Sequence, residues 1–192
     1  MTTQVEEKEE IKKYIIDFVS QSVEKYLAEN ATQEFYAFAF SCDTKDTQIN
    51  LIFNTELDFQ NTLEFHQKEY PERYQSEQDI KALKFDTRTW DYYPDTFYLL
   101  SEEELDEIFM KLSGYEDENS LWEDYDNDYK PLWKEYLKNW LDLFTECLVE
   151  FTKTETYKRI PKTKDFVAFC IDNKESVEQA MDRLKITNEN LN

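Results

Sequence analysis

Residues 35–42 read FYAFAFSC, and their alternation of large and small side chains decides the fold class. Successive side chains of a β-strand point to opposite faces. A strand here is expected to carry Tyr36, Phe38, Phe40 and Cys42 on one face and Phe35, Ala37 and Ala39 on the other. Because that second face is mostly small, the pattern predicts a buried strand with a helix packed close against it.

Two further stretches extend this strand into a sheet. Residues 47–54 alternate apolar and polar side chains, and the turn-like segment before them predicts a hairpin with the first strand. Near the end of the chain, residues 166–171 (FVAFCI) predict a third, apolar strand. We expect all three strands in one sheet, with helices at 5–29 and 131–152 packed against it.

Apolar residues at helical spacing predict the other elements. The strongest stripe is that of 131–152, where Trp140 and Phe144 mark the centre of the face expected to be buried. Ser101 and Glu104 form a capping-box pattern that begins another helix. Weaker patterns predict a helix at 56–69 (marked by Leu57, Leu63 and Tyr70), a short helix after Ser76, a strand near 81–86 and a helix at 174–185. Together they predict an α+β fold, a single domain with a small, mostly antiparallel sheet of three to five strands packed with about five to six helices.

The chain is strongly acidic, and its charge is uneven. Forty-three acids against 22 bases give a formal net charge of −21 for 192 residues. Residues 101–128 hold twelve acids and one base, Lys111, whereas residues 129–192 hold eleven of each. A surface of this kind repels nucleic acid and anionic lipid and attracts basic partners, although an acidic surface can also serve solubility alone.

The composition argues against several kinds of site. One glycine in the whole chain disfavours phosphate loops and dinucleotide fingerprints. The single histidine, His66, stands in no motif for general base catalysis. Cys42, Cys147 and Cys170 lack metal-ligand spacing and fit apolar patterns, which predicts reduced core thiols in a cytoplasmic protein without cofactors. The N-terminal segment resembles no signal peptide, and no apolar run is long enough to cross a membrane.

The acidic segment 115–128 interleaves carboxylates with aromatic side chains. Tyrosine and tryptophan bury large areas at protein interfaces, and carboxylates pair there with lysine and arginine. The segment is therefore a candidate surface for a basic protein partner, although its aromatic residues could instead anchor a solvated linker to the core. The candidate partner-binding residues are Tyr115, Glu116, Asp117, Glu118, Trp122, Glu123, Asp124, Tyr125, Asp126 and Asp128.

Part of this segment matches the carboxylate positions of an EF-hand calcium loop. Asp124, Asp126 and Asp128 stand at alternate positions, and Glu135 follows at the twelfth. The loop requires glycine at its sixth position, where this chain has Tyr129. The mismatch favours an acidic segment that holds no metal.

Three landmarks resemble one bacterial family that is known only as a domain of unknown function and is found in polymorphic-toxin gene neighbourhoods. They are the strand FYAFAF (35–40) with a second strand ending at Asn54-Thr55-Glu56, the stretch KFDTRTWDYY (84–93), and the strand FVAFCID (166–172) before a final helix. The resemblance implies an immunity protein, which neutralises a cognate toxin by binding it and needs no catalytic residue.

Three classes of function stay open at this point. The residues and the resemblance favour a non-enzymatic acidic binding protein that captures a basic toxin domain. A nucleic-acid mimic would also be acidic, but it would carry carboxylates along one face at phosphate spacing. An unrecognised enzyme would show a deep pocket lined by carboxylates with perturbed pKa values.

Calorimetric titration of the protein with Ca²⁺ tests the metal hypothesis. Because Tyr129 replaces the required glycine, we expect no binding tighter than about 10⁻³ M. A micromolar site that disappears in Asp126→Asn would overturn this interpretation of residues 124–135.

Overall fold

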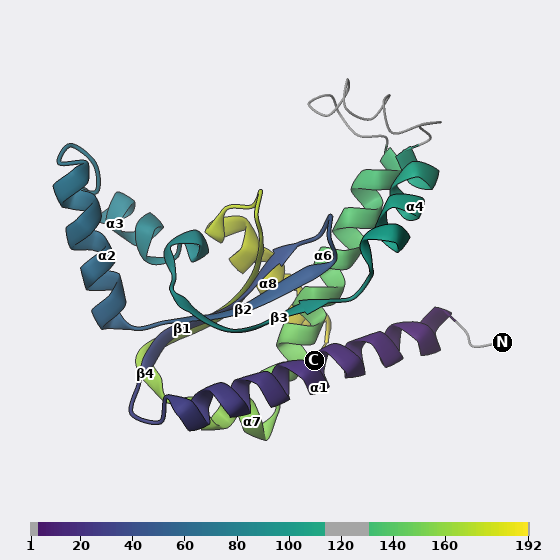
Figure 1. The fold of residues 1–192 in the computed structure, drawn as a ribbon, viewed down its shortest axis with the longest axis horizontal. Helices are drawn as coiled ribbons and strands as arrows, with labels where there is room; N and C mark the ends of the chain where they lie inside the picture. The colour runs from purple at the N-terminus through teal and green to yellow at the C-terminus, as the bar shows by residue number, and fades with distance from the viewer. Residues whose placement is uncertain (1–3, 114–130, 192) are drawn as a thin grey trace.

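The computed structural model describes residues 4–113 and 131–191, which form one α+β domain (Figure 1). Its sheet has four strands in the order β3-β2-β1-β4. The strands are β1 (Phe35–Asp43), β2 (Gln48–Asn54), β3 (Tyr92–Tyr98) and β4 (Lys162–Asp172). β1 and β3 both pair with β2 in antiparallel fashion, whereas β4 runs parallel to β1. The predicted fold class, including a sheet that contains all three expected strands, is confirmed.

Seven α-helices are present in the described residues, one more than expected. Six of them match predicted segments, and the additional one is the short α7. The strand predicted near 81–86 is wrong, because Ser76 caps a helix that continues to Lys84. None of the described helices is long and apolar enough to cross a membrane. They are α1 (Gln4–Glu29), α2 (Glu56–Glu69), α3 (Glu77–Lys84), α4 (Glu102–Ser113), α6 (Pro131–Phe151), α7 (Glu155–Arg159) and α8 (Val177–Asn190), with a 3₁₀ helix, η1, at Thr87–Thr89.

The two longest helices, α1 and α6, cover the face of the sheet that carries the large side chains of β1. Phe38 and Phe40 pack there against Val19 of α1 and Phe144 of α6, and all four side chains are inaccessible to solvent. Burying such side chains contributes about 1.5–3 kcal/mol each. The prediction that the N-terminal helix and the 131–152 helix lie against the sheet is confirmed.

One buried cation ties these two helices together. The ammonium group of Lys12 on α1 lies 2.5 Å from a carboxylate oxygen of Glu150 on α6 and 3.1 Å from one of Glu9. Burial by itself lowers the pKa of Lys12, but the hydrogen bonds and charges of Glu150 and Glu9 raise it above its ordinary value. The lysine therefore stays charged, and its pairing favours one alignment of α1 on α6.

The opposite face of the sheet carries Ala37 and Ala39 and packs against α2, α3 and α8. Ala180 of α8 is fully buried in the same cluster, so small residues meet here as predicted. The predicted placement of Phe35 and Tyr36 is wrong. The pairing of β1 with β4 is irregular between Phe35 and Ala37, and this irregularity puts Phe35 in the α1/α6 core and Tyr36 in the Ala37 cluster.

The centre of the α6 stripe lies one turn later than the sequence indicated. Phe144 is fully buried, whereas Trp140 is only partly buried at the border of the core. Its ring lies between those of Tyr136 and Phe144, each 5.9 Å away between centroids. A stripe of apolar residues shows which face turns inward, but not where along the helix the neighbouring layer ends.

Paired truncations on α6 test this assignment. Phe144→Ala should cost about 3–5 kcal/mol of unfolding free energy because it opens a cavity in the closed core. Trp140→Ala should cost less, about 1–2 kcal/mol, because its ring is already partly hydrated. Urea denaturation of both variants measures the difference, and a larger loss for Trp140→Ala would show that the core is centred on Trp140.

Candidate functional site

All ten predicted partner-binding residues, and Asp124 to Tyr129 of the EF-hand pattern, lie in segment 114–130, outside the described residues. α4 ends at Ser113, α6 begins at Pro131, and these two helices pack against each other at one end of the molecule (Figure 1). α4 is the described part of the acidic region 101–128.

α4 presents a row of carboxylates to solvent. Its N-terminus is held by the predicted capping box, in which the Ser101 N–H donates to Glu104 Oε2 at 2.9 Å and the Glu104 N–H donates to Ser101 Oγ at 3.3 Å. The bond from the Ser101 N–H lowers the pKa of the Glu104 carboxyl. Glu103, Asp106 and Glu107 are exposed beside it, and α4 holds five acids against one base, Lys111.

A second acidic feature is the arm formed by α2, the connection 70–76 and α3. It projects at the end of the molecule away from α4 (Figure 1). Its base is fixed by the main-chain carbonyl of Lys84 at the end of α3. That oxygen accepts hydrogen bonds from Tyr36 Oη at 2.6 Å and from Trp90 Nε1 at 3.1 Å. Asn54 Nδ2 donates in turn to Tyr36 Oη at 2.9 Å. Buried polar groups that satisfy one another hold the arm in one position.

The tip of the arm is a cluster of aromatic rings around His66. The imidazole lies 5.2 Å from the Tyr74 ring and 6.1 Å from the Tyr70 ring, measured between centroids. Tyr74 has a φ of 57°, a left-handed value that costs a non-glycine residue about 1–2 kcal/mol. Gln67 Nε2 donates to the Tyr74 carbonyl at 2.8 Å and helps to hold this turn.

The arm exposes large apolar side chains. Leu57 and Tyr70, which marked the predicted helix, are exposed, as is Phe65. The inward side consists instead of Phe59 and the partly buried Leu63. The sequence does contain a signal for the inward side, because Phe59 and Leu63 are four residues apart and so share one side of the helix. Leu57 and Phe65 form a second apolar pair on the opposite side, and the sequence alone does not show which pair is buried.

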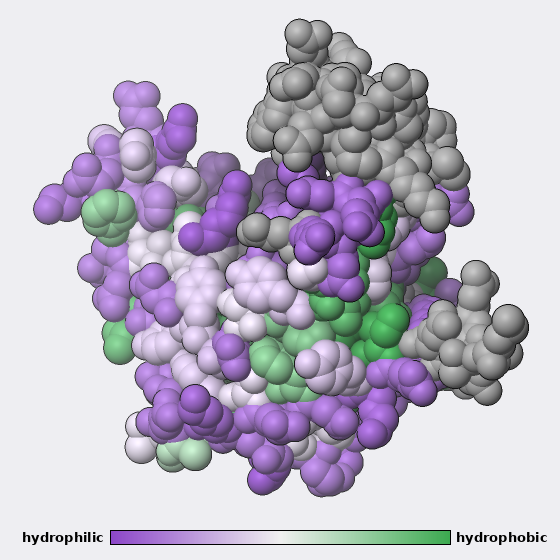
Figure 2. Space-filling view, turned by 45° about the vertical axis from the view of Figure 1, so that its right-hand side comes forward, coloured by the Kyte–Doolittle hydropathy of each residue, from purple (hydrophilic) through white to green (hydrophobic). Residues whose placement is uncertain are grey.

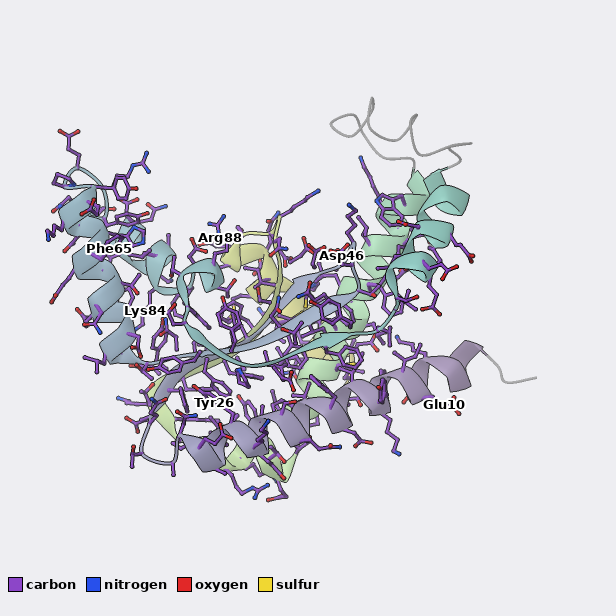
Figure 3. The ribbon with its side chains drawn as sticks, in the orientation of Figure 1. Glu10, Tyr26, Asp46, Phe65, Lys84 and Arg88 are labelled. Carbon is purple, nitrogen blue, oxygen red and sulfur yellow. The ribbon has the colours of Figure 1, made fainter. Side chains whose placement is uncertain are left out.

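A groove of about 950 Å³ lies between the arm and the beginning of α8. Arg88, whose guanidinium is paired with Asp86, stands on one wall (Figure 3). Asp172 and Glu175 line the other. Asp172 accepts hydrogen bonds from the main chain and hydroxyl of Thr44 at 3.1 and 2.8 Å. The described residues contain no group of three or more His, Cys, Asp or Glu side chains arranged to hold a metal.

Glu175 in this groove is bound by Arg183 of α8. The guanidinium donates to both carboxylate oxygens at 2.8 Å and also to the Cys170 carbonyl at 2.8 Å. Burial raises the pKa of the Glu175 carboxyl, and the charge of Arg183 opposes that effect. Both carboxylate oxygens of Glu175 accept hydrogen bonds from Arg183. Glu175 is therefore a structural partner of Arg183, and its carboxylate is not free to act as an acid or base in the groove.

The three cysteines are buried and free, in agreement with their predicted place in the core. Cys42 and Cys170 lie with their Sγ atoms 3.5 Å apart. They belong to neighbouring parallel strands, but β1 pairs Phe40, and not Cys42, with Cys170. This offset of two residues along the strands makes the two thiols a diagonal pair.

The outer edge of β3 is protected against pairing with a further strand. Pro94 supplies no N–H group, and the Thr96 N–H donates to the side chain of Asp95 at 2.9 Å. A proline on an edge strand, and a side chain that occupies a free N–H group, both keep the strand from recruiting another chain. A partner of this protein is therefore expected to meet side chains and not to extend the sheet at β3.

The Arg183–Glu175 pair generates a stability prediction. Arg183→Ala leaves a carboxylate buried without its partner and should destabilise the protein by about 3–5 kcal/mol. The double change Arg183→Leu with Glu175→Leu should recover much of that loss, because neither charge is then buried unpaired. Denaturant unfolding of the two variants makes the comparison, and an equal loss in both would show that packing, not charge, dominates at this site.

The comparisons with known proteins place the chain in a family without naming an activity. The family model described as "Domain of unknown function (DUF4303)" matches residues 15–190. No curated protein and no solved structure matches the chain. The match spans the sheet and both of its helical layers, and it confirms the part of the resemblance that concerned an uncharacterised domain family. The chain belongs to the DUF4303 family.

Proposed function

We propose that this protein is a non-enzymatic acidic binding protein, an immunity protein that neutralises a bacterial toxin by capturing a basic surface of it. The observation that carries the proposal is the acidic surface of α4. Glu103, Asp106 and Glu107 are exposed there, and the helix holds five acids against one base, Lys111. The helix leads directly into the segment that holds the predicted partner-binding residues.

Electrostatic attraction explains why such a surface suits a stoichiometric inhibitor. Complementary charges raise association rates towards about 10⁸–10⁹ M⁻¹s⁻¹ at low salt, whereas uncharged surfaces associate at about 10⁵–10⁶ M⁻¹s⁻¹. An inhibitor must reach the toxin before the toxin reaches its substrate. A fast encounter is therefore worth more to an immunity protein than to most binding proteins.

The groove supports binding over catalysis. Its two inner carboxylates, Asp172 and Glu175, are engaged by Thr44 and Arg183. An enzyme that used them would have to break those contacts in every turnover. The resemblance to proteins of polymorphic-toxin neighbourhoods supports the same reading from an independent side, because such loci pair each toxin with a protein that binds it.

The probe for this proposal is a toxin domain encoded beside the gene for this chain, purified in a catalytically inactive form. We expect the triple variant Glu103→Gln, Asp106→Asn, Glu107→Gln to associate about three- to tenfold more slowly at low salt, and added salt should bring the wild type towards the variant. Stopped-flow kinetics measures both rates.

A matched variant on α8 controls for the loss of three charges. Glu178→Gln, Asp182→Asn and Glu189→Gln neutralise the same residue types at exposed positions in the electrically neutral part of the chain. This variant should associate nearly as fast as the wild type. If both variants slow association equally, the net charge of the protein, and not the position of the α4 carboxylates, sets the association rate. The absence of any complex would refute the proposed function.

A further inference from the structure

The outward face of α2 exposes large apolar side chains that the fold does not use. Leu57 is 70% exposed, Phe65 59% and Tyr70, just past the helix, 50%. The opposite side of the helix already packs on the body through Phe59, which is 5% exposed, and through Leu63. Because the inward side is complete, the exposed residues are not a displaced part of the core.

Leu57 and Phe65 lie on one side of a projecting part of the molecule. Leu57 and Phe65 are eight residues apart, so they lie on the same side of the helix, separated by about 12 Å. Figure 3 places Phe65 on α2 away from the sheet, and Lys84 nearer to it. Figure 2 shows isolated apolar surface on this projection, bordered by hydrophilic residues. Single large apolar side chains within a polar surface suit the role of anchors that enter pockets on a partner.

The charge around this face selects the kind of partner. The arm, residues 56–84, contains seven acids and four bases. Of these bases, Lys81 lines the groove, and Lys84 binds Glu56 and lies 4.4 Å from the centre of the Tyr36 ring. A second copy of the chain would bring two acidic arms together. A basic protein with an apolar pocket would meet both the charge and the anchors.

The base of the arm makes this face a rigid one. Tyr36 and Trp90 both donate to the Lys84 carbonyl, and both side chains are buried. Thr55 and Ser76 cap α2 and α3 by accepting the N–H groups of Asp58 and Asp79 at 3.2 and 3.1 Å. A surface that is already ordered loses little conformational entropy on binding, which favours affinity.

We infer that the outward face of α2, centred on Leu57 and Phe65, is a docking surface for the basic toxin domain, with its apolar side chains entering a pocket on that partner. The inference rests on the proposed function for the identity of the partner, and it adds a second contact region, distinct from α4 and segment 114–130. The acids around the face guide approach, and Phe65 slows dissociation.

Kinetics with the same inactive toxin domain test the surface. Phe65→Ala and Leu57→Ala should each raise the dissociation rate, with a combined loss of affinity on the order of thirtyfold or more. Association rates should change little, since no charge is removed. Ile186→Ala on α8 is the matched control, because Ile186 is 59% exposed and lies on another helix. It should bind like the wild type.

The outcomes separate the two proposals. If the wild type forms the complex and the α4 variant associates slowly, but Phe65→Ala and Leu57→Ala dissociate at the wild-type rate, the proposed function stands and α2 is not the docking surface. If the wild type forms no complex, both fail. Sedimentation of the isolated protein tests whether a second copy of the chain occupies this face instead. A dimer that Phe65→Ala dissociates would assign the face to that second copy.

Discussion

The structure depends on a single strand that is buried on both faces. β1 is hydrogen-bonded to β2 on one side and to β4 on the other, and its residues from Phe35 to Phe40 are almost inaccessible to solvent. Such a strand cannot exist with one face in water. It demands a helical layer on each side, and the side chains of β1 decide which layer lies where. Phe38 and Phe40 share one core with α1 and α6, while Ala37 and Ala39 share the second with Ala180 of α8, which packs on the neighbouring strand β4.

The same strand also holds the arm. Tyr36, displaced to the alanine face by the irregular pairing with β4, reaches the Lys84 carbonyl together with Trp90. Two of the landmarks that carry the family resemblance, FYAFAF and KFDTRTWDYY, therefore meet at one buried joint. The aromatic residues Tyr36 and Trp90 of these landmarks serve to hold the arm on the sheet. It follows that the landmarks identify the fold, and that the partner must be recognised by exposed residues elsewhere.

Sequence patterns were sufficient where the residues of an element themselves fix its type. Alternating side chains predicted β1 and β2, a single apolar stripe predicted each of the two long helices, and the residue types of Ser101 and Glu104 predicted their capping box. They failed where neighbours decide. Trp140 has the right spacing but lies at the border of its layer, and the 81–86 strand pattern yielded to a helix capped by Ser76. On α2, two apolar pairs compete on opposite sides, and only the position of the body shows that Phe59 turns inward and Leu57 outward.

Several cations of this acidic chain are engaged in holding the fold together, which leaves the excess of carboxylates on the outer surface. Lys12 and Arg183 are drawn into the interior, where Glu150 and Glu175 hold them, and Lys84 lies against the Tyr36 ring at the base of the arm. Each of these cations strengthens the fold but is lost to the outer surface. α4 and the arm lie at opposite ends of the molecule (Figure 1), and in both of them the acids outnumber the bases. Their long-range field acts on the encounter and is weakened by salt, whereas apolar anchors such as Phe65 act only after contact. In such a protein one set of residues, the carboxylates, sets the rate of association with a basic partner. A different set, the apolar anchors, sets the rate of dissociation.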